Sequence, residues 1–187
     1  MLTKSDCQKH IRSRYIWSKL VNILIMLGLI INLSQSLTLS ISSVSPDEIE
    51  ASATYNFGLQ PSSGNIPSSA IIKITFPSDR YSTITDGSIS GCLVTAYTVN
   101  TCTGSNTDKS VTLNITGASS FIVIITIPSI TNPSTTDPVS GFGAVLNDTT
   151  SGNTNVDTLA SSGALFTPSP KSLTSATITV ASGHTNK

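Results

Sequence analysis

Apolar and hydroxyl-bearing side chains alternate along much of the chain, which is the pattern of half-buried β-strands. The most apolar stretch outside the N-terminus lies within residues 120–133; it is rich in isoleucine, carries no charge, and is stopped by Pro128 and then by Asn132-Pro133. A β-branched run of this length bounded by prolines favours a buried central strand over a helix. We expect shorter strands to pack around it.

Segments with the same alternation precede and follow this stretch. We predict further strands at residues 37–44, 51–59, 69–76, 92–99, 111–115, 142–146, 159–166 and 173–180. Residues 78–90 hold at most a short edge strand, and residues 147–157 should form a polar turn. Most aromatic side chains fall on inward positions of these strands, namely Tyr55, Phe57, Phe76, Phe121, Phe142 and Phe166, whereas Tyr81 and Tyr97 are the candidates for exposure.

Several short strands with turn signals between them, and no convincing helical period, predict an all-β protein with a single antiparallel β-sandwich over residues 37–166. A closed barrel is the alternative architecture. Residues 167–172 include Pro168 and Pro170, which predict a stiff, extended linker. Residues 173–187 should form a last strand and a tail.

The first 36 residues have the composition of a secretory signal peptide. Basic residues come first, an apolar segment runs from Leu20 to Leu33, and Ser34 and Ser36 suit cleavage before Leu37. The apolar segment is short for a membrane span, which needs about 20 apolar residues. An uncleaved signal anchor that tethers an adhesin to the membrane is the alternative. We therefore expect a secreted, extracellular protein that meets a membrane only during export.

Removal of this leader changes the charge balance. The chain has ten basic and ten acidic residues, and the leader holds five of the basic residues and Asp6. The remainder therefore has a net charge of about −4, with no cluster of basic residues, which argues against a nucleic-acid partner. It has about 150 residues, enough for one domain, and about a third of them are Ser or Thr.

Two cysteines remain outside the leader, Cys92 and Cys102. Their separation of about ten residues fits one disulfide that closes a hairpin or loop. Such a bridge persists only in an oxidising compartment, in agreement with export. A metal site is the alternative, and it is disfavoured because no histidine lies nearby in the sequence. We expect no cofactor.

The sequence contains no comparable pattern of catalytic residues. His184 is the only histidine after the leader, and it falls in the predicted tail. Both remaining cysteines should be oxidised, which removes them as nucleophiles. The acidic residues fall in turns rather than in apolar surroundings that would raise a carboxyl pKa. We therefore expect that the chain is not an enzyme.

Glycosylation has the clearest local signals. Asn114 and Asn147 each begin an Asn-x-Ser/Thr sequon without an intervening proline. Asn147 is predicted to lie in the polar turn, and Asn114 on an outward-facing strand position. Thr167 and Ser169, beside the linker prolines, are candidates for O-linked sugars.

A calcium site is a weaker candidate. Around Gly152, oxygen ligands are offered by Asp148, Asn153, Asn155 and Asp157. Their spacing is not that of an EF-hand, and no glutamate supplies a bidentate oxygen pair. Asp, Asn and Gly are also the residues that tight turns prefer, so a plain turn is the favoured interpretation.

The order of these features resembles a known family. Phe76-Pro77 ends an Ile-rich strand, the cysteine pair follows, and then come a second Ile-rich strand, residues 130–133 (Ile-Thr-Asn-Pro) and an aromatic strand at Phe142. This order is similar to the immunoglobulin-like repeat units of large secreted and surface-coat proteins of protists, ciliates especially. The resemblance covers most of residues 37–166 and implies an immunoglobulin-like β-sandwich with a structural or adhesive role. Such units are usually concatenated, whereas this chain has one.

The C-terminal segment resembles the opening strand of such a unit. Residues 172–180, like residues 36–44, are led by leucine, rich in hydroxyls and closed by valine. We predict that this strand is donated to the sheet of another copy by β-augmentation, with interface residues Leu173, Ala176, Ile178 and Val180. Repeated head to tail, the contact builds an open filament or coat. Pairing within its own sheet is the alternative for this strand, and a monomeric module that binds glycans or proteins is the alternative function.

Overall fold

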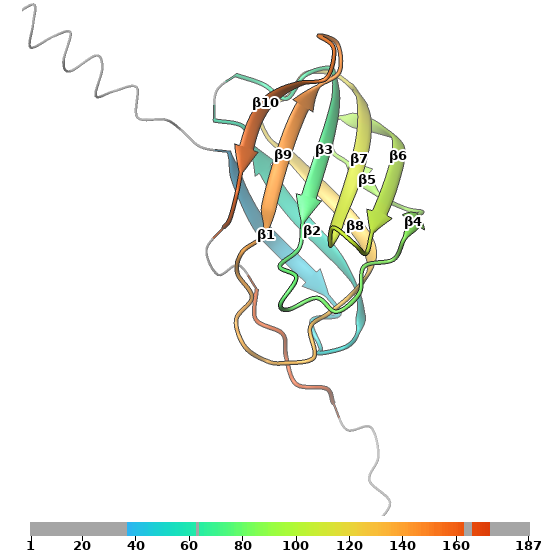
Figure 1. Ribbon diagram of the computed structural model, residues 1–187, viewed down its shortest axis with the longest axis vertical. Coiled ribbons are helices and arrows are strands. Elements are labelled where there is room, and N and C mark those ends of the chain that lie inside the picture. Colours follow the sequence, from blue (N-terminus) through green and yellow to red (C-terminus); the bar gives the residue numbers. More distant parts are fainter. Residues whose placement is uncertain (1–36, 63, 163–165, 173–187) are drawn as a thin grey trace, which may run out of the picture. The chain divides into compact units, whose positions relative to one another are not determined.

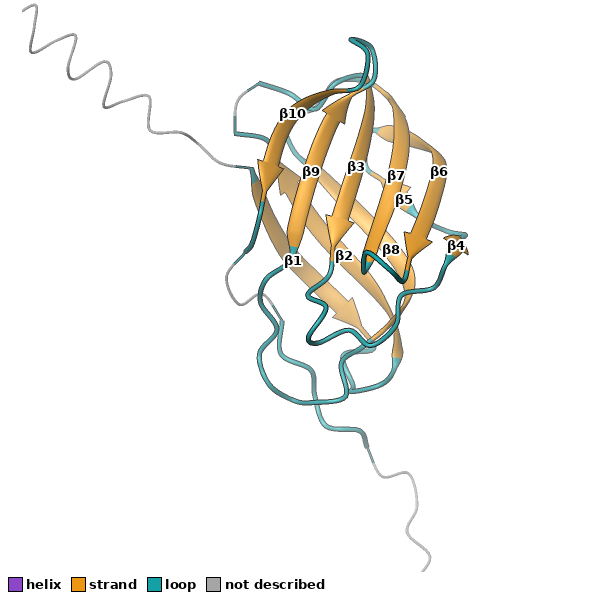
Figure 2. Cartoon of the chain, viewed as in Figure 1, coloured by secondary structure: helices purple, strands orange, loops and turns teal. Residues whose placement is uncertain are grey.

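The computed structural model describes residues 37–62, 64–162 and 166–172 (Figure 1). The predicted leader and the predicted C-terminal strand lie outside these residues. The described residues form ten strands and no helix, so none of them forms a helix able to cross a lipid bilayer (Figure 2). The strands are β1 (Thr38–Ser45), β2 (Ser52–Gln60), β3 (Ser69–Thr75), β4 (Gly87–Ser88), β5 (Leu93–Val94), β6 (Tyr97–Ser105), β7 (Ser110–Gly117), β8 (Val123–Thr131), β9 (Gly143–Asp148) and β10 (Thr154–Leu159).

These strands form one antiparallel sheet in the order β1-β2-β8-β5-β6-β7-β3-β9-β10, with the short β4 beside β6. The sheet curls on itself, so that β1, β2 and β8 lie behind β10, β9, β3, β7 and β6 (Figure 1). The short strand β5 connects the two layers because it pairs with both β8 and β6. No ladder joins β1 to β10 in the described residues, so the sheet is curled but is not a closed barrel.

The core lies between the two layers and is built from the inward half of each alternating strand. On β3, Ala70, Ile72 and Ile74 are buried while Lys73 points outward, as the sequence predicts. The predicted inward positions of β2 and β7 are likewise buried. At the centre, aromatic rings pack with centroids 5.0–6.2 Å apart, and they belong to Tyr55, Phe57, Phe76, Tyr81, Phe142 and Phe166.

Two aromatic residues are not where the alternation predicts them. Tyr81 is buried rather than exposed, because its hydroxyl finds a partner inside the core, the hydroxyl of Tyr55 at 2.8 Å. Phe121 is exposed rather than inward, because the chain bends there before β8 begins. Tyr97 is only partly exposed, and its hydroxyl donates a hydrogen bond to the carbonyl of Ile66 (2.8 Å).

The Ile-rich stretch forms β8 and confirms a strand at this position, but two details of the prediction are wrong. The strand continues through Pro128, because a bulge sets Pro128 and Ser129 opposite the single residue Thr54, where a missing N–H costs no ladder bond. Only one face of the strand is buried, since Ile124 and Thr126 point away from the core. It is therefore an interior strand with an open outer face.

Two further predicted elements have different boundaries. Residues 92–99 were expected to form one strand, but the chain reverses at Ala96 (φ 65°) and forms β5 and β6. Residues 147–157 were expected to form a turn and residues 159–166 a strand. Instead, Gly152 and Asn153 take positive φ angles of 82° and 63° and reverse the chain early, so that β10 starts at Thr154.

Candidate functional site

The outermost strands, β1 and β10, have no strand partner on their outer sides within the described residues. Ile41 and Val44 of β1 and Leu159 of β10 pack against the core, but each remains partly exposed. Most inward apolar side chains of the interior strands are buried almost completely, although Tyr97 and Val99 of β6 are also partly exposed. An added strand at these edges would gain backbone hydrogen bonds and cover apolar surface. The two sheet edges are therefore the candidate site for association.

Asp157 bridges the two edges at one end of the gap between them. Its carboxylate accepts hydrogen bonds from the backbone N–H of Ser62 (2.6 Å) and of Leu37, which immediately precedes β1. Burial alone would raise the pKa of Asp157, but these bonds, with one from Thr158, outweigh it and hold the pKa below its ordinary value. Figure 1 shows the end of β10 beside the start of β1.

Replacing Asp157 by alanine should lower the free energy of unfolding by about 1 kcal/mol, because two backbone N–H groups lose their acceptor at a position that water can reach. The pKa is depressed in the fold, so the charge-dependent part of this stabilisation is present above pH 3.8, the ordinary value, and is lost as the pH falls below it. Urea denaturation at several pH values measures both effects. Asp79→Ala is the control, because Asp79 makes only a long, exposed ion pair with Arg80 (3.8 Å); equal losses in the two variants would contradict the bridge.

The predicted linker is hydrogen-bonded to the turn between β1 and β2 at Ser169. The backbone N–H of Ser169 donates to the carbonyl of Asp47, and the N–H of Ile49 donates to the carbonyl of Ser169 (2.9 Å each). The Ser169 hydroxyl also donates to the Asp47 carboxylate at 3.1 Å, whereas Thr167 is exposed. Ser169 is thus fixed to the turn between β1 and β2. Of the two candidate O-glycosylation residues, Thr167 is the more accessible.

A buried polar network holds that turn in place. Tyr55 donates its hydroxyl proton to Oδ1 of Asn132 (2.7 Å), so the Tyr81 hydroxyl must donate to Tyr55. Nδ2 of Asn132 donates to the carbonyls of Pro46 (3.0 Å) and Glu48 (2.8 Å). Burial raises the pKa of both tyrosines above the ordinary value, so both hydroxyls stay neutral and act as hydrogen-bonding groups.

This role of Asn132 was not predicted from the sequence, which placed the residue only at the end of the apolar stretch, before Pro133. An asparagine directly after an apolar strand and before a proline was the available signal. The residue is almost fully buried, and its backbone N–H donates to the carbonyl of Ala51 (2.8 Å). Asn132 therefore joins the end of β8 to both sides of the β1–β2 turn, which is the turn that receives Ser169.

Both sequon asparagines lie on the outer face of the layer that contains β3. Asn114 of β7 and Asn147 of β9 pair with Ile71 of β3 from its two sides, and both are partly exposed. The prediction that Asn147 lies in a turn is wrong, because the β9–β10 ladder continues past it to Asp148. The two sequons, distant in sequence, are thus gathered on one face.

Three of the four calcium candidates make hydrogen bonds within the protein. Asp148 accepts hydrogen bonds from the hydroxyl and N–H of Thr150 (2.6 and 2.7 Å), which lower its pKa, and Asn155 donates to the Thr158 hydroxyl (3.0 Å). Asp157 is engaged with Ser62, as described above. Across the described residues there is no group of three or more His, Cys, Asp or Glu placed to hold a metal ion. Asn153 takes a positive φ (63°) in the turn between β9 and β10, as tight turns of Asn and Gly allow.

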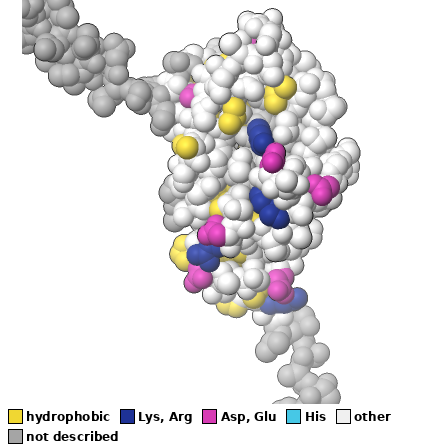
Figure 3. Space-filling model, in the orientation of Figure 1, with side chains coloured by type: hydrophobic (Ala, Val, Ile, Leu, Met, Phe, Trp, Pro, Cys, Tyr) yellow, Lys and Arg dark blue, Asp and Glu magenta, His cyan; other side chains and the backbone are white. Residues whose placement is uncertain are grey.

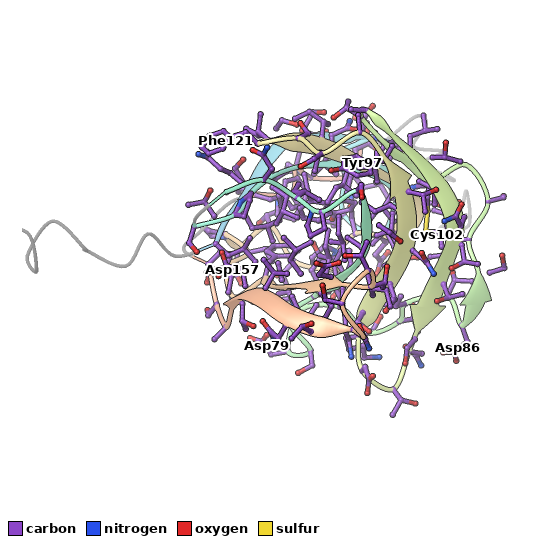
Figure 4. The ribbon with its side chains drawn as sticks, turned by 90° about the horizontal axis from the view of Figure 1, so that it is seen from above. Asp79, Asp86, Tyr97, Cys102, Phe121 and Asp157 are labelled. Atoms are coloured by element: carbon purple, nitrogen blue, oxygen red, sulfur yellow. A yellow bond between two sulfur atoms is a disulfide. The ribbon has the colours of Figure 1, made fainter. Side chains whose placement is uncertain are left out.

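Cys92 and Cys102 form a disulfide, as predicted, with a Cα–Cα distance of 6.3 Å (Figure 4). The bridge ties the segment before β5 to the middle of β6, and both half-cystines are buried. A shallow hollow beside it is lined by Ser88, Asn100 and Thr103 among others. These are hydroxyl and amide groups without an ionisable partner, so the hollow contains no acid–base pair.

No protein-family model matches this chain, and no curated protein matches its sequence.

Proposed function

We propose that this chain is a secreted structural protein whose copies assemble head to tail into an extracellular filament or surface coat. In this proposal residues 1–36 are a cleaved signal peptide, and residues 37–166 are an immunoglobulin-like β-sandwich similar to the repeat units of ciliate-type surface proteins. Residues 173–180 are donated as a strand to the next copy. The observation that carries the proposal is that β1 and β10 have no outer strand partner among the described residues and carry incompletely covered apolar side chains.

The β1 edge is the better acceptor of the two. β10 has six residues, a bulge between Asn155 and Asp157, and a carboxylate bonded across the gap. Bulges and charges are devices that protect sheet edges from pairing. β1 has eight residues and no charge, although it also has a bulge between Ile41 and Ser43. A strand placed along β1 would cover Ile41 and Val44.

The positions of the chain ends support a head-to-tail order. The described body begins at Leu37, beside the end of β10, and it ends at Ser172 beyond the β1–β2 turn, at the opposite end of the body (Figure 1). The donor, residues 173–180, follows directly and matches β1 in length, about 26 Å when extended. A strand that leaves one copy at this end can therefore lie along β1 of the copy that follows.

The donor pattern is complementary to the acceptor. Ala176, Ile178 and Val180 alternate with Thr177 and Thr179, so one side of an extended strand is apolar and the other carries hydroxyls. Placed beside β1, the apolar side would meet the core next to Ile41 and Val44. The hydroxyl side would face water, as Ser40 and Ser42 do on β1.

Deletion of residues 172–187 should abolish filaments seen by electron microscopy. Two point variants make the test sharper, because Ile178→Asp places a charge on the core-facing side of the donor, whereas Thr179→Asp places the same charge on its outer side. We expect Ile178→Asp to remove filaments and Thr179→Asp to keep them. Filaments that survive the deletion would refute strand donation. A wild-type chain that stays monomeric while it binds immobilised glycans would favour the alternative, a binding module.

Secretion would also expose both sequons to glycosylation. Sugars on Asn114 and Asn147 would cover the β7–β3–β9 face and leave β1 and the outer face of β8 free. Glycosylation is thus compatible with assembly through β1, because the modified face and the acceptor edge are separate.

A further inference from the structure

Four large apolar side chains are exposed around β8 and β5: Phe121 (52% exposed), Ile122 (53%), Ile124 (37%) and Leu93 (64%). We call these four residues the β8 patch. Leu93 pairs with Thr126, the outward position that follows Ile124 on β8, so Leu93 and Ile124 are diagonal neighbours on the outer face. Phe121 and Ile122 lead directly into β8, and Figure 4 places Phe121 on the opposite side of the body from Asp79.

The strands that form and flank the patch, β1, β2, β5 and β8, contain no charged side chain (no Asp, Glu, Lys or Arg). Gly58 lies between Ser40 and Ile124 in the ladder, so no side chain rises above the sheet at that point. An interface built here would need neither ion pairs nor the desolvation of a charge.

The polar side chains that border the patch are already bonded to one another. The hydroxyl of Thr126 donates to Oδ1 of Asn56 (2.6 Å), and Nδ2 of Asn56 donates to the hydroxyl of Ser43 (2.9 Å). Covering these groups therefore leaves few hydrogen bonds unmade, which is the usual cost of burying a polar surface. The face can be covered by a dry, apolar contact.

The opposite layer differs in each respect. Figure 3 shows Lys, Arg, Asp and Glu side chains spread over its face. Lys73 of β3 forms an ion pair with Asp108 (3.0 Å), and both sequon asparagines lie on the neighbouring strands. Charged side chains and sugars would oppose a close protein–protein contact on that layer. The face with the β8 patch is therefore the better candidate for such a contact.

We infer that the β8 patch is a lateral interface with a second copy of this chain. In a two-fold contact both copies present the same surface, so a patch with an excess of one sign of charge would repel its own copy. The chain after residue 36 has nine acidic and five basic residues, so its charged surface has such an acidic excess. A face without charges avoids it. A lipid surface fits less well, because no basic side chain from these strands is available to bind anionic headgroups.

This contact is independent of strand donation and adds to it. Donation joins copies along a row, whereas the β8 patch joins neighbouring rows side by side. The two contacts together convert a single filament into a paired filament or a coat. Without donation the β8 patch would still form dimers, and without the β8 patch donation would still form single filaments. The two contacts can therefore be tested separately.

The test uses the full-length secreted chain with Ile178→Asp, which blocks donation, and measures self-association by sedimentation equilibrium. We expect dimers whose dissociation constant changes little between about 0.05 and 0.5 M salt, because no charges meet. Adding Leu93→Glu and Ile124→Glu should raise that constant about 100-fold or more, because apolar contacts are lost and like charges are introduced. Both side chains point outward, so the fold should be retained, which thermal unfolding checks.

The matched control is Val156→Glu with Thr103→Glu, which places two glutamates on exposed positions of β10 and β6. This control should dimerise like the parent. A parent that remains monomeric, or a dimer indifferent to the Leu93 and Ile124 changes, would overturn the interface. So would dimer loss on deletion of residues 172–187, which would identify the occupant as that segment. In chains with intact donation, the patch variant should give single filaments rather than none.

Discussion

Replacing Phe76 by alanine is expected to lower the free energy of unfolding by about 4 kcal/mol. Phe76 follows β3 directly and is 1% exposed. Its ring contacts those of Tyr55, Phe57, Tyr81 and Phe142, with centroids 5.0–5.9 Å apart. Alanine would leave a cavity walled by rigid rings, which cannot relax to fill it, so the loss should fall in the upper part of the usual range. Urea denaturation with an unchanged m-value measures it.

Phe121→Ala makes the same chemical change at an exposed position and serves as the matched control. Its ring is half exposed in the bend before β8. The loss of stability there should stay below about 1 kcal/mol, since little apolar area is returned to water. Similar losses in the two variants would contradict the placement of these two phenylalanines. Phe121→Ala should instead weaken the lateral contact.

Replacing Asn132 by alanine is expected to lower the free energy of unfolding by about 3 kcal/mol, a large effect for a polar residue. The change leaves the buried Tyr55 hydroxyl without its acceptor, which costs about 1–3 kcal/mol. It also removes the Asn132 donor from the half-buried carbonyls of Pro46 and Glu48, although the Glu48 carbonyl still accepts from the N–H of Ala51 (3.3 Å). The β1–β2 turn, which these bonds hold, should also lose protection in amide hydrogen exchange.

Asn100→Ala is the control for this substitution. The Asn100 amide exchanges hydrogen bonds with the hydroxyl of Thr116 on the protein surface, where water can replace both groups. Its loss should stay within about 0.5 kcal/mol. An Asn132 variant no less stable than the Asn100 variant would show that the buried network does not hold the turn.

Strands were predictable where alternation and turn residues agreed. Residues 69–76 have an unbroken alternation that ends at Pro77, and β3 covers nearly the same range. The reversal at Ala96 was not predictable in the same way, because alanine rarely takes a positive φ and no turn residue marks the site. The bulge at Pro128 was not predicted, because proline ends most strands. Only the pairing of β8 with β2 shows that the proline is tolerated within this strand.

The candidate site was harder to predict than the strands, because its properties depend on pairing between distant segments. The sequence indicates that Ile41 and Val44 face inward, but not that their strand lies at an edge. The partners of Asn132 and Asp157 lie far away in the chain, so neither residue carries a local signal of its role. Phe121 belongs to an exposed patch because the chain bends at this residue, and the alternation of apolar and polar residues does not predict that bend.

The clasp between Ser169 and the β1–β2 turn has a mechanical consequence. Both backbone bonds of Ser169 reach that turn, so tension applied at the C-terminal end enters the sheet at the base of β1 and β2 rather than at β10. A pull along these strands loads all their ladder bonds at once, whereas a pull at β10 would unzip it from β9 one bond at a time. In the proposed filament, a row of such units would therefore resist stretching along its length.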